Sequence, residues 1–315
     1  MDDILNNTYI TLDGYVELQK YRYIYFLIMF TAYLIIICCN STIVCLIVIN
    51  KNLHEPMYIF IAALLINSVL FSTATYPKLF IDVLSEKQII SYSACLFQWF
   101  IYYSLGGSEF LLLAAMSYDR YVSICKPLQY PTIMRKRNIG IILVLNWLLP
   151  VSEFAPSIVL NANIKLCNFI FSGIICNSTV VQLHCVGSRA LNIYGLVCFV
   201  NILLLPVLFI LYTYTKILII SYRSCRAVRR KAAQTCLPHL VVFINFTCLS
   251  AYDILLVRLD TDLLKTVRLL ITMQIILYHP IFNPIIYGLK MREISKHLKR
   301  LFHSDKNVST QLYRH

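Results

Sequence analysis

The chain has 315 residues, of which 59% are hydrophobic and only 14% are charged, and its mean hydropathy is +0.69. These values exclude an ordinary soluble globular domain, which must present a more polar surface to water. The formal net charge of +13 does not indicate nucleic-acid binding, because the cations lie beside apolar runs rather than on a polar face with interleaved aromatic residues.

Apolar runs long enough to cross a bilayer recur along almost the whole sequence. A spanning helix needs roughly 20 mainly apolar residues. We predict about seven spans, at 24–49, 57–81, 92–125, 139–160, 190–222, 232–257 and 266–288. Unbroken apolar runs argue against a membrane β-barrel, whose strands alternate in polarity. The predicted fold is an all-α membrane protein: a bundle over 24–288, after an N-terminal segment 1–23 and before a C-terminal segment 289–315.

The positions of Lys and Arg predict the orientation. These residues gather at 126–137, 223–231 and 290–300, after the third, fifth and seventh spans. Short cationic loops stay in the cytoplasm, so we expect the N-terminus outside and the C-terminus inside at the plasma membrane, with the cations near anionic lipid headgroups. The acidic N-terminal segment predicts no removable signal peptide. The sequons at Asn6 and Asn177 fall outside and are the predicted glycosylation sites.

Four of the twelve cysteines lie where disulfides are expected. Cys95 is at the outer start of the third span, and Cys167, Cys176 and Cys185 are spaced through the polar loop that follows the fourth span. The outer face of a membrane is oxidising. Four cysteines allow three pairings, and the residues alone do not choose among them.

The third span carries charged residues inside an apolar run. Arg120 lies at its inner end, where a cation is costly unless it is paired or reaches water, and Asp119 is the nearest counter-ion. Glu109 falls on the same helical stripe, about 16 Å from Arg120, and should face the bundle interior. Two alternatives stay open for it: a neutral, hydrogen-bonded structural acid, or a carboxylate in a sodium or proton site. Its expected neighbours at mid-bundle depth are Asn40, Asn67, Ser68 and Asn283.

The last span contains a predicted hinge. Pro284 removes a backbone donor and clashes with the preceding turn, which predicts a kink. Asn283 and Tyr287 lie one turn apart on one face and would form a polar latch. Tyr214 and His239 are candidates for the same cytoplasmic-side network, although a packing role for His239 is an equal alternative.

Five segments resemble a known family in both content and order. They are 53–58, 77–78, 116–130, 231–240 and 280–287. Together they resemble the rhodopsin-like seven-helix receptors and, within them, the olfactory receptors, with a similarity to the fish members. The resemblance implies an odorant receptor that binds a small molecule in the outer half of the bundle and activates a stimulatory heterotrimeric G protein of the olfactory type.

The resemblance also implies roles for particular residues. It pairs Cys95 with Cys176 and Cys167 with Cys185, which makes the outer loop a lid over the pocket. It makes Asp119, Arg120 and Tyr121 a switch in which Arg120 is held at rest and freed when the sixth span swings outward. The alternative interpretation of these charges is an anchor at the membrane interface.

The chain departs from the wider receptor pattern in two places. Asn67 and Ser68 stand where an aspartate is usual in the second span, which puts a sodium site of the common kind in doubt. The sixth span has Asn-Phe-Thr-Cys at 245–248, where the wider receptor family has a switch that contains a tryptophan. Olfactory receptors generally lack that tryptophan too, and they carry an acid at the place of Glu109.

Depth and family position predict the residues of the pocket. They are Tyr102, Tyr103, Gly106, Gly107, Cys198, Ile202, Ser250, Ala251, Ile254 and Met273, with Arg258 as a candidate partner for an anionic ligand unless Asp260 and Asp262 neutralise it. No acid lies near Tyr102, which disfavours an amine ligand.

Other functions are less compatible with the sequence. We see no phosphate loop, zinc-ligand spacing or nucleophile–base arrangement, so we expect no enzymatic activity, cofactor or metal cofactor. A transporter would need repeated halves or discontinuous spans. A non-olfactory receptor of the same fold stays the alternative. Residues 289–302 should form an amphipathic helix on the inner membrane surface, followed by a tail from about Ser304.

Overall fold

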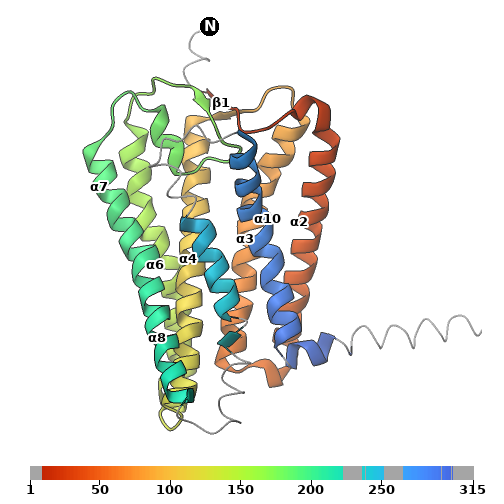
Figure 1. Cartoon of the computed structure of the whole chain (residues 1–315), viewed down its shortest axis with the longest axis vertical. Coiled ribbons are helices and arrows are strands. Elements are labelled where there is room, and N and C mark those ends of the chain that lie inside the picture. The colour runs from red at the N-terminus through yellow and green to blue at the C-terminus, as the bar shows by residue number, and fades with distance from the viewer. Residues whose placement is uncertain are drawn as a thin grey trace, which may run out of the picture.

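The computed structural model describes residues 9–222, 236–251 except 238, and 265–300 except 292 and 299. Within these ranges the long helices run side by side as a bundle, with three short strands at the end near the N-terminus (Figure 1). The helices of the bundle are α2 (Leu18–Ile49), α3 (Pro56–Leu84), α4 (Tyr92–Cys125), α6 (Lys136–Ala162), α7 (Arg189–Cys198), α8 (Leu205–Tyr222) and α10 (Lys265–Lys290). The sixth predicted span is represented by His239–Ala251. The helical bundle predicted from the sequence is confirmed.

The predicted boundaries differ from the structure mainly where polar residues continue a helix. α2 begins at Leu18 rather than at 24, because Gln19, Lys20 and Arg22 lower the hydropathy of the first turns. The helix is kinked there, at Tyr21, whose φ of −113° and ψ of 16° are not helical. The fifth span is divided: α7 passes into a π-helical turn, η3 (Phe199–Leu204), before α8. Pro206, which has no backbone N–H to donate, is the second residue of α8, two positions after the end of η3.

The last span bends one turn earlier than the predicted hinge. Lys265–Tyr278 and Pro280–Gly288 meet at 42°, so the break lies just before Pro280. Pro284 cannot donate to the carbonyl of Pro280, and the ladder of hydrogen bonds opens at that carbonyl rather than at the proline itself.

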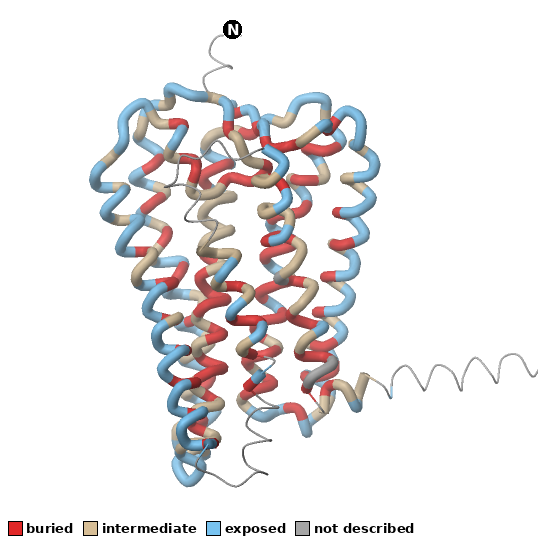
Figure 2. Tube along the Cα trace, viewed as in Figure 1, coloured by how far each residue is buried: buried red, intermediate tan, exposed pale blue. Residues whose placement is uncertain are grey.

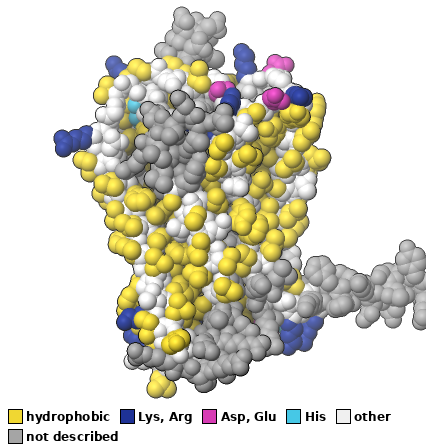
Figure 3. Space-filling view, in the orientation of Figure 1, with side chains coloured by type: hydrophobic (Ala, Val, Ile, Leu, Met, Phe, Trp, Pro, Cys, Tyr) yellow, Lys and Arg dark blue, Asp and Glu magenta, His cyan; other side chains and the backbone are white. Residues whose placement is uncertain are grey.

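The outside of the bundle is apolar. Among the described residues, α2, α3, α6 and Arg189–Tyr222 are long and apolar enough to cross a membrane, and the bent α10 is a fifth candidate. Figure 3 shows hydrophobic side chains over the middle of the visible face and charged ones toward its two ends. Leu27 and Val48, for example, are each 65% exposed. Such a surface suits lipid rather than water.

The strands, which the sequence did not predict, form a small sheet at the end of the bundle near the N-terminal segment, which the sequence predicts to be the outer end. β1 (Tyr9–Leu12) lies between β2 (Ile89–Ser91) and β3 (Ile170–Phe171), antiparallel to β2 and parallel to β3. Ile10 and Leu12 point inward and are buried, whereas Tyr9 and Thr11 are exposed. The sheet ties the N-terminal segment to two loops that lie far apart in the sequence.

The interior is packed most densely in the half of the bundle away from these strands. Figure 2 shows buried residues concentrated along the inward faces of the helices. The largest buried cluster joins α3, α4, α8, the sixth span and α10 around residues such as Leu64, Leu113 and Ile210. Residues 293–298 are helical, and Ile294 packs into the same cluster. The predicted helix 289–302 is therefore described in part, and its end and the tail from 304 lie outside the described residues.

Candidate functional site

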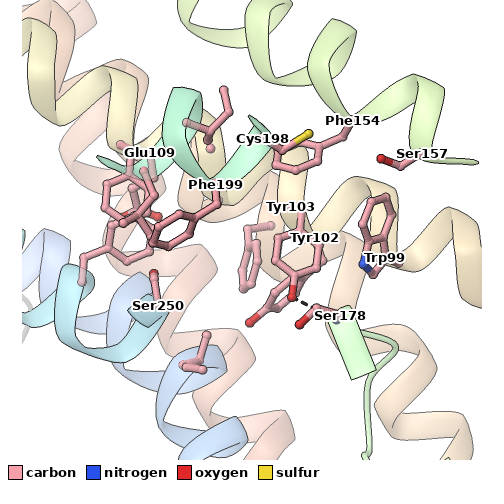
Figure 4. Close-up of a pocket in the computed structure, with 18 of the residues that line it drawn as sticks. Trp99, Tyr102, Tyr103, Glu109, Phe154, Ser157, Ser178, Cys198, Phe199 and Ser250 are labelled. Carbon is pink, nitrogen blue, oxygen red and sulfur yellow. Dashed lines mark hydrogen bonds between the residues drawn. The ribbon is translucent and has the colours of Figure 1, made fainter. Parts of the chain in front are cut away.

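A cavity of about 180 Å³ opens inside the bundle between α4, α6, η3, the sixth span and α10 (Figure 4). Of the pocket residues predicted from the sequence, those that line it are Tyr102, Tyr103, Gly106, Gly107, Cys198, Ile202 and Ser250. Ala251 and Met273 are not among the lining residues, and Met273 packs instead against the cluster around Tyr76 and Leu269. Ile254 and Arg258 lie outside the described residues.

Aromatic rings from several helices form much of the wall. Trp99, Tyr103 and Phe154 contact one another, with ring centroids 5.2 to 5.9 Å apart. The rings of Phe110 and Phe246, nearer the middle of the bundle, are tilted by 34° with their centroids 4.3 Å apart. Trp99 shares a helical stripe with Tyr103 and Gly106, so its spacing could have identified it. Phe154 comes from α6, and no pattern in its own segment indicates the pocket.

The two neighbouring glycines have different roles. A Cβ at Gly106 would meet nothing within 4 Å, so this glycine keeps the cavity wide. A Cβ at Gly107 would lie 2.8 Å from Cγ2 of Ile202 and 3.0 Å from Cβ of Pro150. Gly107 therefore lets α4 approach η3 and α6 closely, which sets the position of the pocket wall.

The outer loop is fixed over the cavity by covalent bonds and hydrogen bonds. Disulfides join Cys95 to Cys176 and Cys167 to Cys185. The backbone N–H of Ser178 donates to Oη of Tyr103 at 3.0 Å. The Cys95–Cys176 bond and the Ser178–Tyr103 hydrogen bond connect the loop directly to α4, and Cys167–Cys185 closes the loop on itself.

The side chain of Asn177 caps the short helix η2 (Ser178–Leu183), accepting from N and Oγ1 of Thr179 at 3.1 and 2.7 Å. Asn6, the other predicted glycosylation site, lies outside the described residues. Further along the loop, Nε2 of His184 lies 3.1 Å from Oη of Tyr92, and burial lowers the pKa of this histidine.

The inner end of α4 holds a buried ion pair. Nε and Nη2 of Arg120 donate to Oδ2 of Asp119 at 3.0 and 2.5 Å, and Asp119 is fully buried. Oδ1 of Asp119 accepts from the hydroxyl of Tyr130 at 2.8 Å. Tyr130 begins the short helix α5 (Tyr130–Ile133), and burial and the charge of Asp119 raise its pKa. Tyr121 follows the pair and is half-buried, with Nζ of Lys126 5.9 Å from its ring centroid.

Comparison with known proteins agrees with this arrangement. A family model described as olfactory receptor matches residues 29–305. Human olfactory receptor 11A1 is 32% identical over 300 residues, which cover 93% of each chain. Human olfactory receptor 51E1 is 31% identical over 305 residues, which cover 94% of each chain.

This chain belongs to the olfactory receptor family. It is therefore a multi-pass membrane receptor with the seven-helix fold, an odorant receptor that couples to G proteins. The family is one of receptors rather than of enzymes.

A polar network crosses the middle of the receptor. Nδ2 of Asn283 donates to Oε1 of Glu109 at 2.9 Å and to Oγ of Ser68 at 3.1 Å. Asn67, an expected neighbour of Glu109, instead donates to the carbonyl of Leu105 and accepts from Nε1 of Trp147. The network therefore links α3, α4 and α10 just below the pocket.

Asn40, which was predicted to be a neighbour of Glu109, has other hydrogen-bond partners in the structure. Its Nδ2 donates to the carbonyl of Pro280 at 2.8 Å and to that of Ile36 at the same distance. The Pro280 carbonyl is the acceptor that Pro284 cannot pair. Asn40 thus supplies the hydrogen bond that a kinked helix needs in lipid.

One further pair and a buried tyrosine lie on the side of the receptor predicted to be the inner one. The hydroxyl of Tyr214 is hydrogen-bonded to Nδ1 of His239, which joins α8 to the sixth span. Tyr287 is fully buried one turn after Asn283. Sequence reasoning missed Tyr130, although this residue ends the segment 116–130 that carries the resemblance.

Proposed function

We propose that the receptor binds the apolar part of a small odorant in the cavity below the outer loop and signals at the inner end of α4 to a stimulatory G protein. The observation that carries this proposal is that one helix contributes to both sites. Gly106 faces the cavity and Arg120 forms the buried ion pair, about 21 Å further along the axis. A rigid helix of this kind can connect ligand occupancy with the inner face.

The chemistry of the cavity supports a mainly apolar ligand. Its wall is aromatic and aliphatic, with a few hydroxyls such as those of Tyr103 and Ser250. Glu109 reaches the wall but accepts from Asn283. Such a pocket excludes water and selects by shape, with single polar groups fixing orientation.

In the resting state that we propose, Asp119 and Tyr130 together hold Arg120 away from the inner surface. Outward movement of the sixth span would separate His239 from Tyr214 and open the surface below Arg120. The freed guanidinium would then contact the G protein. Asn283 and the bent α10 would transmit movement between the pocket and this region.

Glu109 fits the structural alternative better than the sodium alternative. The amide nitrogen of Asn283 lies between Ser68 and Glu109, where it donates a hydrogen bond to each. A cation would need that position.

We further propose that the N-terminus is extracellular and the receptor lies in the plasma membrane. Both disulfides occur at the end of the bundle that carries β1, and disulfides persist on the oxidising side (Figure 1). The inner end would then contact the G protein and anionic lipid headgroups.

The test is cyclic-AMP production in cells that express the receptor with a stimulatory G protein, challenged with pooled volatile and water-soluble odorants. We expect a response that Arg120→Ala abolishes while surface expression is unchanged. A matched control is Arg22→Ala, at the outer end of α2, which should leave the response intact. Silence across the pools at good surface expression would contradict an odorant function.

A further inference from the structure

A second, larger cavity of about 630 Å³ lies beside the pocket, between α4, α6, η2 and α7. It exists because α7 stands away from the bundle. Of the ten residues of α7, only Cys198 is buried. A Cβ added at Gly195 would meet nothing within 4 Å, so the space beside this helix is open.

The two cavities adjoin each other. Trp99, Ser157, Ser178 and Gly195 line both of them. Figure 4 shows Trp99 and Ser157 at the end of the pocket opposite Glu109. The two cavities therefore share part of their wall, so a ligand in one lies next to the other.

The outer chamber differs from the pocket in its polar groups. Arg189 and Asn192 line it from α7, and both are exposed. Within the part of the chain that the structure describes, Arg189 has no hydrogen bond and no carboxylate within ion-pair distance. The guanidinium is thus available to an anion from outside.

Two further groups on the wall lack partners. Asn161 is 4% exposed, and its Oδ1 is buried without a hydrogen bond among the described residues. Oγ of Ser178 is likewise buried and unpaired. Leaving a buried acceptor unpaired costs about 1–3 kcal/mol, so a ligand that supplies a donor here gains affinity.

We propose that the outer chamber is a second ligand subsite, which binds a carboxylate with a neighbouring O–H group while the apolar part of the same molecule fills the inner pocket. Arg189 provides the charge for the carboxylate and Asn192 an N–H donor. Asn161 accepts from the ligand hydroxyl. The proposal rests on the pocket being the odorant site, and it assigns that site a class of ligand: small amphiphilic hydroxy acids.

The test uses the full receptor in nanodiscs and requires no signalling. Gly195→Cys is treated with an anionic and with a cationic methanethiosulfonate reagent, and the unsubstituted receptor gives the background from the native cysteines. We expect the anionic reagent to react several-fold faster, and the cationic reagent more slowly, than each does in a Gly195→Cys/Arg189→Gln receptor. Gly195→Cys/Lys165→Gln is the matched control, because Lys165 is an exposed loop cation that does not line the chamber.

Protection by soluble probes then tests the ligand class. We expect 2-hydroxyoctanoate to slow the labelling of Gly195→Cys more than octanoate does, and 1-octanol to slow it least. Replacement of Arg189 by Gln should remove the advantage of both acids. The subsite proposal would be overturned if Gly195→Cys is not labelled above background. It would also be overturned if labelling and protection do not change when Arg189 is replaced. A receptor that passes this test yet gives no cyclic AMP would contradict the proposed function and leave the subsite standing.

Discussion

The two ends of α4 lie in opposite environments. At the outer end the helix faces open space, because Gly106 presents no side chain and aromatic rings surround a cavity. At the inner end it buries an ion pair, and Asp119 accepts from both Arg120 and Tyr130. The outer end therefore offers a cavity whose shape can select a ligand, whereas at the inner end specific hydrogen bonds hold the side chains. The same helix thus carries a surface suited to ligand selection and a fixed polar contact.

The largest expected effect concerns the disulfides that hold the outer loop over the cavity. Cys176→Ser should remove most receptor from the cell surface, because Cys95–Cys176 closes a loop with a sequence separation of 81 and both cysteines are fully buried. Loss of such a bond costs about 2–5 kcal/mol in small secreted domains. Cys185→Ser breaks the Cys167–Cys185 bond, whose cysteines have a sequence separation of only 18, and should reduce surface expression less. Flow cytometry of a tagged receptor measures both, and equal losses would contradict the assigned importance of the first bond.

The inner end can be disrupted without touching the pocket. Asp119→Asn should raise basal cyclic AMP several-fold, because an amide cannot neutralise Arg120, and breaking a buried pair costs about 3–5 kcal/mol. Tyr130→Phe removes one hydrogen bond and should raise basal cyclic AMP less.

Tyr222→Phe is the control for this pair of variants, since Tyr222 is 79% exposed. Unchanged basal cyclic AMP in Asp119→Asn at equal surface expression would show that the ion pair does not restrain the receptor.

Substitutions of the two adjacent glycines test helix packing and cavity volume independently. Gly107→Ala should destabilise the receptor by about 1–3 kcal/mol, because the new Cβ would overlap Ile202 and Pro150. Gly106→Ala should raise the melting temperature slightly, because alanine is the better helix former and its Cβ has space, and should narrow the cavity, which shifts odorant potency. Thermal unfolding of purified receptor distinguishes the two, and equal melting temperatures would contradict the close approach at Gly107.

The smallest effect is a pH dependence of the outer loop. Burial lowers the pKa of His184 below its ordinary value of 6.5, so the unfolded loop binds a proton more readily than the folded loop. The contribution of His184 to stability is therefore present above pH 6.5 and is lost as the pH falls from there through the lowered pKa. Hydrogen exchange of residues 166–185, measured relative to the intrinsic exchange rate at each pH, should accelerate as the pH falls through this window.

In a His184→Gln receptor that acceleration should disappear. His54→Gln, in the connection between α2 and α3, should keep it. Acceleration that persists without His184 would assign the pH dependence to another group of the loop.

Hydropathy and charge determined the class, the approximate spans and the expected sidedness, because lipid imposes long apolar helices whatever their neighbours are. The stripe on the third span also indicated that Glu109 and Arg120 face inward, since helical periodicity is local. The segments 116–130 and 280–287 were sufficient to suggest the family. All of these are properties of short stretches of sequence.

Only the tertiary structure decided which groups meet. Asn40 pairs with the Pro280 carbonyl rather than with Glu109, and Tyr130 contacts Asp119 from a separate helix. Phe154 joins the aromatic wall and α7 leaves a second chamber beside it. The strands of the outer sheet are too short to show a pattern of their own, and they form because distant loops supply their partners. Contacts of this kind depend on distances between elements, and the packing of the bundle sets those distances.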